Sequence, residues 1–286
     1  MRRIIQLFQW RIIDIIPIVQ ELKNKFTAIQ ISPLQPIKDN GGEWWKLYQP
    51  CDLTIGNYLG TTEDLTKLTE ECKKYNIEVY ADLVLNHVAG ANDGTIKPHE
   101  KVNPKLINKY FMKSTNRITN WKNRYEVINY SIGVPGLRTD NYDLQDIMIK
   151  FIENYIECGI KGFRIDAAKN IALPTEHCDF FTRVIKRFRD KGIYTYAEVI
   201  LADKWLIDEY CKYTDVLTDS FGSDKNKLVT FVESHDSYLD DIIGYTKKLS
   251  EWDIIREYKY LCNIYNNTLF YNRPFSDMYR LVDNIK

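Results

Sequence analysis

Residues 162–169 read GFRIDAAK, and this stretch combines the features on which the fold prediction depends. The run from Gly162 to Ile165 is short and largely apolar, as in a strand that is buried on both faces of a parallel sheet. Arg164 and Asp166 stand two residues apart, so their side chains point to the same side of an extended chain. The stretch therefore predicts a buried strand that carries polar groups at its C-terminal end.

Strands and helices are predicted to alternate on both sides of this stretch. Eight short runs rich in Ile, Val, Tyr and Phe are candidate strands: residues 4–10, 28–32, 78–85, 162–165, 194–199, 216–219, 228–232 and 268–271. Between them, apolar residues recur at helical spacing beside capping or stop signals. These helical patterns are Leu65, Leu68, Cys72 and Tyr75 after Thr61 and Asp64; Ile147, Phe151, Ile152 and Tyr155 before Gly159; Phe181, Val184, Ile185 and Phe188 before Gly192; and Ile254, Tyr258, Leu261 and Tyr265 after Ser250 and Asp253. The alternation fits a closed (β/α)8 barrel as well as a doubly wound sheet, and periodicity alone does not choose between them.

One connection is much longer than the others. More than fifty residues separate Leu85 from Leu144. A connection of that length is usually a functional loop or a small inserted subdomain. The segment contains Trp121, Tyr125 and Tyr130, and these aromatic residues favour a folded subdomain.

The charge balance and the N-terminus exclude several classes of partner. Lys+Arg and Asp+Glu both total 39, so there is no electrostatic reason to expect binding to nucleic acid or to an anionic membrane. Gln6, Gln9 and Arg11 interrupt the first apolar stretch and Asp14 and Pro17 the next, which argues against a signal peptide or a transmembrane helix. The six cysteines are scattered without metal-ligand spacing. We therefore expect a cytoplasmic monomer with reduced thiols.

Polar residues stand at the C-terminal ends of four predicted strands. They are Asp82 with Asn86 and His87, Arg164 with Asp166, Glu198, and His235 with Asp236. In a parallel barrel these ends share one rim, which is where catalytic residues lie. A single buried carboxylate can be a structural ion-pair partner, but four such strand ends at one rim indicate a functional site.

The residue types at this rim restrict the chemistry. The sequence contains no glycine-rich phosphate loop, His/Cys metal cluster or serine nucleophile elbow. Carboxylates remain, and two of them about 5–5.5 Å apart can hydrolyse a glycosidic bond with retention of configuration. Arg164 would keep Asp166 ionised, as a nucleophile requires. Glu198 lies between Ala197 and Val199, a drier setting that favours the role of proton donor.

Four motifs of this chain resemble the four short regions of the α-amylase family (glycoside hydrolase family 13), in the family's order. They are residues 82–87 (DLVLNH), 162–169 (GFRIDAAK), 198–200 (EVI) and 231–236 (FVESHD), while residues 31–33 and 44–50 resemble further segments of the family. The resemblance extends from residue 1 to about residue 275. It implies a (β/α)8 barrel formed by residues 1–88 and 141–286, with residues 89–140 inserted as a small subdomain after the third strand.

Carried over position by position, the resemblance implies a role for each residue of the site. Asp166 would attack the anomeric carbon, Glu198 would act as acid and then base, and Asp236 would bind the distorted sugar and stabilise the transition state. The expected substrate-binding residues are Arg164, His87 and His235 around the reacting sugar, Tyr48 stacked on its ring, Lys169 on the leaving-group side, and Trp44, Trp45 and Gln49 on the glycone side.

The chain departs from the family at the calcium site and at the C-terminus. Gly136 stands where the family often has a calcium-binding Asp, and Asn170 stands where a His usually donates its backbone carbonyl. Asn86 keeps its ligand position, but with one carboxylate missing we expect calcium to bind there weakly or not at all. The chain ends about a dozen residues after Pro274, without the family's C-terminal β-sandwich, and residues 276–286 are predicted to form a short last helix.

These patterns predict hydrolysis of α-1,4-glucosidic bonds in starch, glycogen or maltodextrin through a covalent glycosyl-enzyme, with an α-glucan or maltooligosaccharide as the partner. Two alternatives stay open. A sugar instead of water could intercept the covalent intermediate, which would make the protein a transglycosylase. The lost calcium carboxylate and the missing C-terminal domain could instead mark a truncated, catalytically inactive glucan-binding homologue. The complete set of carboxylates favours an enzyme.

Overall fold

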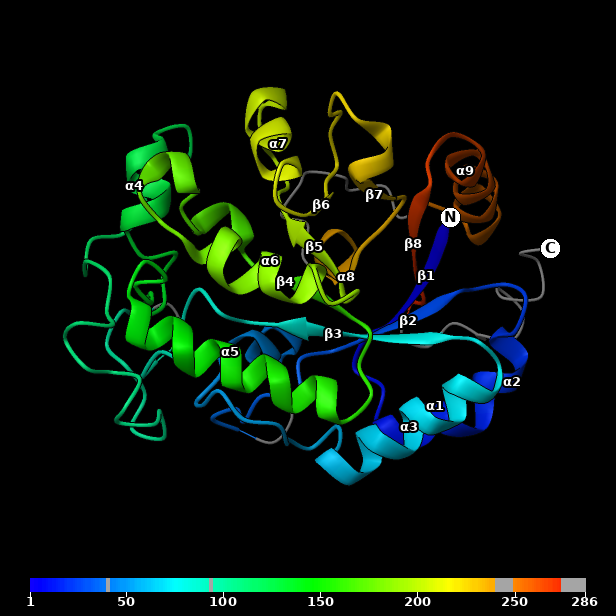
Figure 1. The fold of residues 1–286 in the computed structure, drawn as a ribbon, viewed down its shortest axis with the longest axis horizontal. Coiled ribbons are helices and arrows are strands. Elements are labelled where there is room, and N and C mark those ends of the chain that lie inside the picture. Colours follow the sequence, from blue (N-terminus) through cyan, green and yellow to red (C-terminus); the bar gives the residue numbers. More distant parts are fainter. Residues whose placement is uncertain (40–41, 93–94, 240–248, 274–286) are drawn as a thin grey trace.

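The computed structural model describes residues 1–39, 42–92, 95–239 and 249–273, and its centre is a closed barrel of eight parallel strands (Figure 1). Each strand pairs with its neighbours in the chain, and the last strand pairs with the first. The fold is therefore the (β/α)8 barrel and not the doubly wound sheet. The strands are β1 (Arg2–Leu7), β2 (Ala28–Ile31), β3 (Glu78–Leu83), β4 (Gly162–Ile165), β5 (Tyr194–Glu198), β6 (Asp215–Leu217), β7 (Leu228–Phe231) and β8 (Asn267–Tyr271).

All eight predicted strands form, with ends that differ from the prediction by a few residues. β1 ends at Leu7 and not at Trp10, because Gln9 adopts a φ of 62° and this left-handed conformation interrupts an extended chain. The parallel register brings the C-terminal ends of all strands to one rim of the barrel. The polar strand ends predicted from the sequence consequently share that rim.

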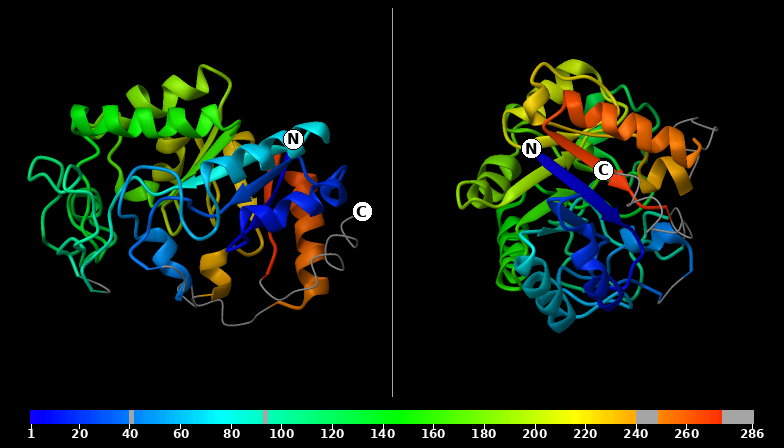
Figure 2. Two further views of the ribbon diagram at one scale, coloured as in Figure 1. Left: turned by 90° about the horizontal axis from the view of Figure 1, so that it is seen from below. Right: turned by 90° about the vertical axis from the view of Figure 1, so that its right-hand side faces the viewer.

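Helices follow most strands and cover the outside of the barrel (Figures 1 and 2). Thr61 caps α3 in a reciprocal capping box with Asp64, and Gly159 follows α5 with a φ of +91°, so both predicted signals are confirmed. The α-helices of the described residues are α1 (Ile12–Ile15), α2 (Val19–Leu22), α3 (Thr62–Lys74), α4 (Arg124–Asn129), α5 (Tyr142–Glu157), α6 (Lys186–Arg189), α7 (Lys204–Cys211), α8 (His235–Leu239) and α9 (Glu251–Ile264).

The helix predicted before Gly192 differs in its first turns. It begins as a π-helical segment, Phe180–Ile185, and continues as α6. In a regular helix two consecutive residues point about 100° apart. The wider turn lets the adjacent side chains of Phe180 and Phe181 both become fully buried.

The interior of the barrel is filled by side chains. Tyr80, Tyr194 and Tyr196 pack there with ring centroids 5.4–6.2 Å apart. Gly162 on β4 gives the Tyr80 ring its space, because a Cβ at this position would lie 2.4 Å from that ring. The interior is thus a packed core and not a channel, so a ligand has to bind at the rim.

The long segment after β3 lies at one end of the molecule, at the left of Figure 1 and of the left view in Figure 2. Its described part contains α4 together with turns and loops. Arg124, at the start of α4, forms an ion pair of 2.7 Å with Glu176 of the barrel and donates to the backbone oxygen of Lys169. The segment is thereby attached to the connection that follows β4.

Three further sequence predictions concern the C-terminal helix, membrane-spanning helices and the cysteines. The helix predicted at residues 276–286 lies outside the described residues. Within the described part of the chain, no helix has the length and apolar character needed to cross a membrane. All six cysteines are free thiols, and four of them are buried.

Candidate active site

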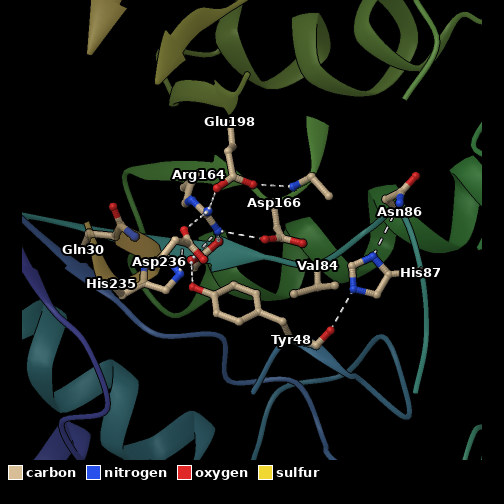
Figure 3. A network of polar contacts seen from close by, with 12 residues as sticks. Gln30, Tyr48, Val84, Asn86, His87, Arg164, Asp166, Glu198, His235 and Asp236 are labelled. Atoms are coloured by element: carbon tan, nitrogen blue, oxygen red, sulfur yellow. Dashed lines mark hydrogen bonds and ion pairs between the residues drawn. The ribbon is translucent and has the colours of Figure 1, made fainter. Parts of the chain in front are cut away.

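Arg164 on β4 is the centre of the polar rim (Figure 3). Its Nη1 donates to both oxygens of Asp82 at 2.8 Å and to Oδ1 of Asp166 at 3.0 Å, whereas its Nη2 binds Glu198. Asp236 on α8 lies 4.0 Å from the same Nη2. The fold therefore gathers around one guanidinium the three carboxylates predicted to be catalytic, from segments far apart in the sequence.

The four carboxylates differ in their exposure. The side chain of Asp82 is 0% exposed, and the exposure rises to 10% for Asp166, 12% for Glu198 and 20% for Asp236. Asp82 is also held by the Tyr48 hydroxyl, which donates to it at 2.9 Å. Asp82 thus closes the floor of the site, and the other three carboxylates can reach a ligand.

One guanidinium shared by four carboxylates leaves the site short of positive charge. Burial raises the pKa of Asp166 well above its ordinary range, and the charges of Glu198 and Asp82 add to this rise, against the opposing effect of Arg164. Burial also raises the pKa of Asp82, to about 6. The ion pair predicted between Arg164 and Asp166 forms, and Arg164 lowers the pKa of Asp166 as expected, but burial raises that pKa by more. The cluster binds a proton more readily than isolated carboxylates do.

Glu198 is held from two sides. One carboxylate oxygen contacts Arg164, and the other accepts the backbone N–H of Ala167 at 2.9 Å. Ala167 has a φ of 46° and a ψ of 33°, a left-handed conformation that is uncommon for a residue with a side chain. Backbone strain directly after Asp166 thereby accompanies the positioning of Glu198, as is frequent at functional sites.

Aromatic rings form one wall of the site. The ring of Tyr48 stacks on His235 with centroids 5.1 Å apart and an interplanar angle of 10°, and Trp44 meets His235 edge-on at 5.5 Å. Phe8, just beyond β1, stacks on His235 with ring centroids 4.5 Å apart and on Tyr48 with ring centroids 6.2 Å apart. The guanidinium of Arg164 lies 5.5 Å from the centroid of Tyr48. Phe8 was not predicted, because one aromatic residue after a strand carries no signal of function.

The two histidines of the rim have different surroundings. The Nδ1 atom of His235 accepts from the amide of Gln6 at 2.9 Å, and its Nε2 lies 3.2 Å from Oδ2 of Asp236. His87 instead donates from Nε2 to the backbone oxygen of Tyr48 at 2.8 Å. Burial lowers the pKa of both imidazoles, that of His87 to about 4. Neutral imidazoles can hydrogen-bond sugar hydroxyls, but they do not balance the carboxylates.

Lys169, which the resemblance assigns to the leaving-group side, lies beside the end of β5. Its Nζ donates to the backbone oxygen of Ile200, two residues after Glu198, at 2.8 Å. The same ammonium lies 5.3 Å from the ring centroid of Trp121, an exposed residue of the segment after β3. Lys169 therefore connects the rim of β5 to that segment.

Two of the predicted glycone-side residues have contacts away from the carboxylates. Gln49 is buried, and its Oε1 accepts the backbone N–H of Gly90 at 3.3 Å. Trp45 is partly buried, with the Nζ of Lys38 at 5.7 Å from its ring centroid. These contacts support the loop that carries Tyr48.

An arginine beyond β8 was not predicted from the sequence. The guanidinium of Arg273 holds the carboxylate of Glu233 through Nε at 2.8 Å and Nη2 at 2.5 Å, and it donates to the backbone oxygen of Leu249 at 2.7 Å. Glu233 stands three residues before Asp236. The ion pair thus fixes the loop of Asp236 to the end of β8. No local sequence pattern predicts this contact.

The oxygens expected to bind calcium are engaged by an amino group. The Nζ of Lys113 donates to Oδ1 of Asn86 and to the backbone oxygen of Asn170, both at 2.7 Å. Gly136 brings no carboxylate and packs against the stem of the lysine. In the described part of the chain, no group of three or more His, Cys, Asp or Glu residues could hold a metal ion. These residues do not fit a bound calcium ion.

Proteins similar to this chain are named as α-amylases or α-amylase-related proteins. The model of the α-amylase catalytic domain matches residues 12–251. An α-amylase of Clostridium acetobutylicum is 30% identical over 261 aligned residues, and the match covers 79% of this chain and 34% of the relative. An α-amylase-related protein of Drosophila auraria is 30% identical over 182 residues, with 59% of this chain and 37% of the relative covered. The chain thus spans little more than a third of the length of these relatives.

Solved structures share the fold. α-Amylase I from Eisenia fetida superposes with a TM-score of 0.77 at 20% identity and covers 96% of this chain, which in turn covers 68% of that protein. The α-amylase of Geobacillus thermoleovorans, solved in complex with acarbose, gives a TM-score of 0.75 at 16% identity, with 99% and 76% covered. At these identities the likeness concerns the fold alone. Because the catalytic-domain model matches most of its length, the chain belongs to the α-amylase family, glycoside hydrolase family 13.

Proposed function

We propose that this protein is a retaining glycoside hydrolase that cleaves the α-1,4-glucosidic bonds of starch, glycogen or maltodextrin. The observation that carries the proposal is the position of two partly exposed carboxylates, Asp166 and Glu198, on the two terminal nitrogens of Arg164. Membership of the α-amylase family supports an α-glucan as the substrate.

The shared guanidinium also supports the retaining mechanism. Nη1 and Nη2 of Arg164 belong to one planar group, so the carboxylates that contact them are close together. Retaining glycosidases have carboxyl groups about 5–5.5 Å apart, whereas inverting enzymes need about 6.5–9.5 Å to admit a water molecule. The compact arrangement favours direct attack by one carboxylate.

In the first step, an oxygen of Asp166 forms a bond to the anomeric carbon while the bond from that carbon to the glycosidic oxygen breaks. Glu198 transfers its proton to that oxygen, so the leaving sugar departs with a hydroxyl group and Asp166 remains as a glycosyl ester. The raised pKa of Asp166 means that this step requires a pH at which its carboxyl group is ionised.

In the second step, the Glu198 carboxylate takes a proton from water, and the water oxygen attacks the anomeric carbon and displaces Asp166. Two inversions at one carbon restore the original configuration. Asp236 is the most exposed of the four carboxylates around Arg164. It would bind hydroxyls of the reacting sugar and stabilise the positive charge that develops on the sugar ring. Tyr48 and Trp44 offer apolar ring surface to a pyranose beside it.

Product analysis with maltoheptaose tests the proposal. We expect shorter maltooligosaccharides, and proton NMR during the first turnovers should detect the α-anomer of the new reducing end. Products longer than the substrate would identify a transglycosylase. A β-anomer would contradict the retaining mechanism. If correctly folded protein binds maltoheptaose but forms no new product, the proposal of an enzyme is contradicted and a glucan-binding homologue is supported.

A further inference from the structure

A lysine holds the junction between the barrel and the segment after β3. Lys113 belongs to that segment, and its Nζ donates to Oδ1 of Asn86 and to the backbone oxygen of Asn170, both at 2.7 Å. Asn86 follows β3, and Asn170 ends the short helical turn after β4. Two oxygens from the connections that follow the neighbouring strands β3 and β4 therefore converge on one cationic nitrogen of the segment after β3.

The stem of the lysine fills the space in which another ligand would stand. A Cβ at Gly136 would lie 2.9 Å from Cδ of Lys113, and the backbone N–H of Lys113 donates to the oxygen of Gly136 at 2.8 Å. An acidic side chain at position 136 and the lysine at position 113 consequently exclude each other. The absence of a carboxylate at position 136 and the presence of the Lys113 ammonium therefore depend on each other.

The contact continues from Lys113 towards the active site. The amide nitrogen of Asn86 lies 3.5 Å from Nδ1 of His87, and Nε2 of His87 donates to the backbone oxygen of Tyr48 at 2.8 Å (Figure 3). Because the Asn86 oxygen accepts from the lysine, its amide nitrogen is directed to His87. Lys113 thereby fixes the orientation of a chain of groups that ends at the aromatic wall.

We propose that the ammonium group of Lys113 takes the place of a divalent cation at this junction and makes the folded state independent of calcium. A metal ion would draw the same oxygens together by its charge, and the lysine does so with a covalently attached charge and directed hydrogen bonds. Lys113 is a positioning residue, since it acts on the site through Asn86 and His87.

Removal of metal from the unaltered protein is the first test. Burial lowers the pKa of Lys113 to about 7, so the measurement is made at pH 6. We expect the melting temperature to change by less than about 1 °C between 5 mM EDTA and 5 mM CaCl2. A melting temperature that falls by several degrees in EDTA, or rises by as much with Ca²⁺, would overturn the proposal.

Loss of the charge is the second test. Lys113→Met keeps the length of the side chain but leaves both oxygen acceptors without their donor, and we expect the melting temperature to fall by at least about 5 °C. Lys105→Met, at an exposed lysine of the same segment, is the matched control and should leave it unchanged. An unchanged melting temperature in Lys113→Met would contradict the proposal. If that variant does not fold, the metal test on the unaltered protein still decides.

Conversion of the junction into a metal site is the third test. In Lys113→Ala with Gly136→Asp, the ammonium is removed and a carboxylate is supplied beside Asn86 and Asn170. We expect 5 mM Ca²⁺ to raise the melting temperature of this double variant by several degrees, and to have no effect on Lys113→Ala alone. No calcium-dependent rise in the double variant would show that the ammonium does not stand in the position of a cation.

Discussion

At the scale of the residue, the role proposed for Asp166 leads to a sharp prediction. Asp166→Asn removes the attacking oxygen anion but keeps the shape of the side chain and its contact with Arg164. We expect kcat on maltoheptaose to fall by on the order of 10³-fold or more, since the covalent route is lost. Oligosaccharide binding, followed by intrinsic fluorescence, should persist. Asp143→Asn, at an exposed residue of α5, is the control, and near-normal turnover in Asp166→Asn would refute the assignment.

The charge of the same residue predicts a pH dependence. Burial and neighbouring carboxylates raise the pKa of Asp166 well above its ordinary value of 3.8. Only the ionised form can attack, so activity is lost as the pH falls through this raised pKa and is gained as the pH rises through it. The acidic limb of kcat/KM, which reports the free enzyme, should therefore lie well above that value. Full kcat/KM at pH 4 by a folded protein, as judged by circular dichroism, would contradict the expectation.

Which residues of the site could be predicted depends on how local their signal is. Arg164, Asp166 and Glu198 stand at strand ends, and the alternation of side chains along a strand is enough to bring them to one rim. Phe8 and Arg273 act through partners more than 200 and about 40 residues away in the chain. Their contribution depends on barrel closure, which no short pattern contains. The sign of the pKa shift of Asp166 depends first on its burial and then on the carboxylates that share Arg164, and both appear only in the fold.

At the scale of the element, the connection between β7 and α8 is fixed from outside. Arg273, after β8, pairs with Glu233, and both side chains are nearly buried, with 12% and 10% exposure. Arg273→Met would leave a carboxylate without its partner, which costs roughly 3 kcal/mol when such a pair is buried. We expect a lower melting temperature and, because Asp236 loses its support, a fall in kcat of about tenfold with a smaller change in KM.

The double variant Arg273→Met with Glu233→Gln is the matched control for this ion pair. Because Glu233→Gln replaces the carboxylate with a neutral amide, much of the stability lost in Arg273→Met should return. The effects of the two substitutions on the free energy of unfolding should therefore be strongly non-additive in a double-mutant cycle. Strict additivity would mean that the two side chains act independently. An unchanged kcat in both variants would show that the ion pair does not position Asp236 for catalysis.

Element boundaries followed the sequence where capping was local and departed from it where packing decided. The Thr61–Asp64 capping box forms because all its atoms lie within one turn. The π-helical turn at Phe180–Ile185 arises because two adjacent phenylalanines both pack inward, a demand set by the barrel surface beneath them. Propensity carries the first kind of information and not the second.

At the scale of the whole molecule, periodicity predicts alternating strands and helices but leaves the closure of the sheet undecided. What closes this barrel is the register between β1 and β8, from Arg2 with Asn267 to Gln6 with Tyr271, and the packing of large rings inside. Eight strands give an interior just wide enough to be filled by side chains. Large residues on some strands therefore require small residues on their neighbours.

Gly162 tests that requirement. It lies opposite Tyr80 in the β3–β4 register, and a Cβ there would meet the Tyr80 ring at 2.4 Å while Tyr194 restrains the same ring from 5.4 Å. We expect Gly162→Ala to destabilise the protein by about 1–3 kcal/mol through overpacking, seen as a drop of several degrees in melting temperature. In a Tyr80→Leu background, where the ring is gone, the same substitution should cost much less, because the clash is the only source of the penalty. Equal costs in both backgrounds would place the effect in strand conformation and not in the packed interior. A melting temperature unaffected by Gly162→Ala would mean that the interior can yield, contrary to the close packing on which the location of the site at the rim depends.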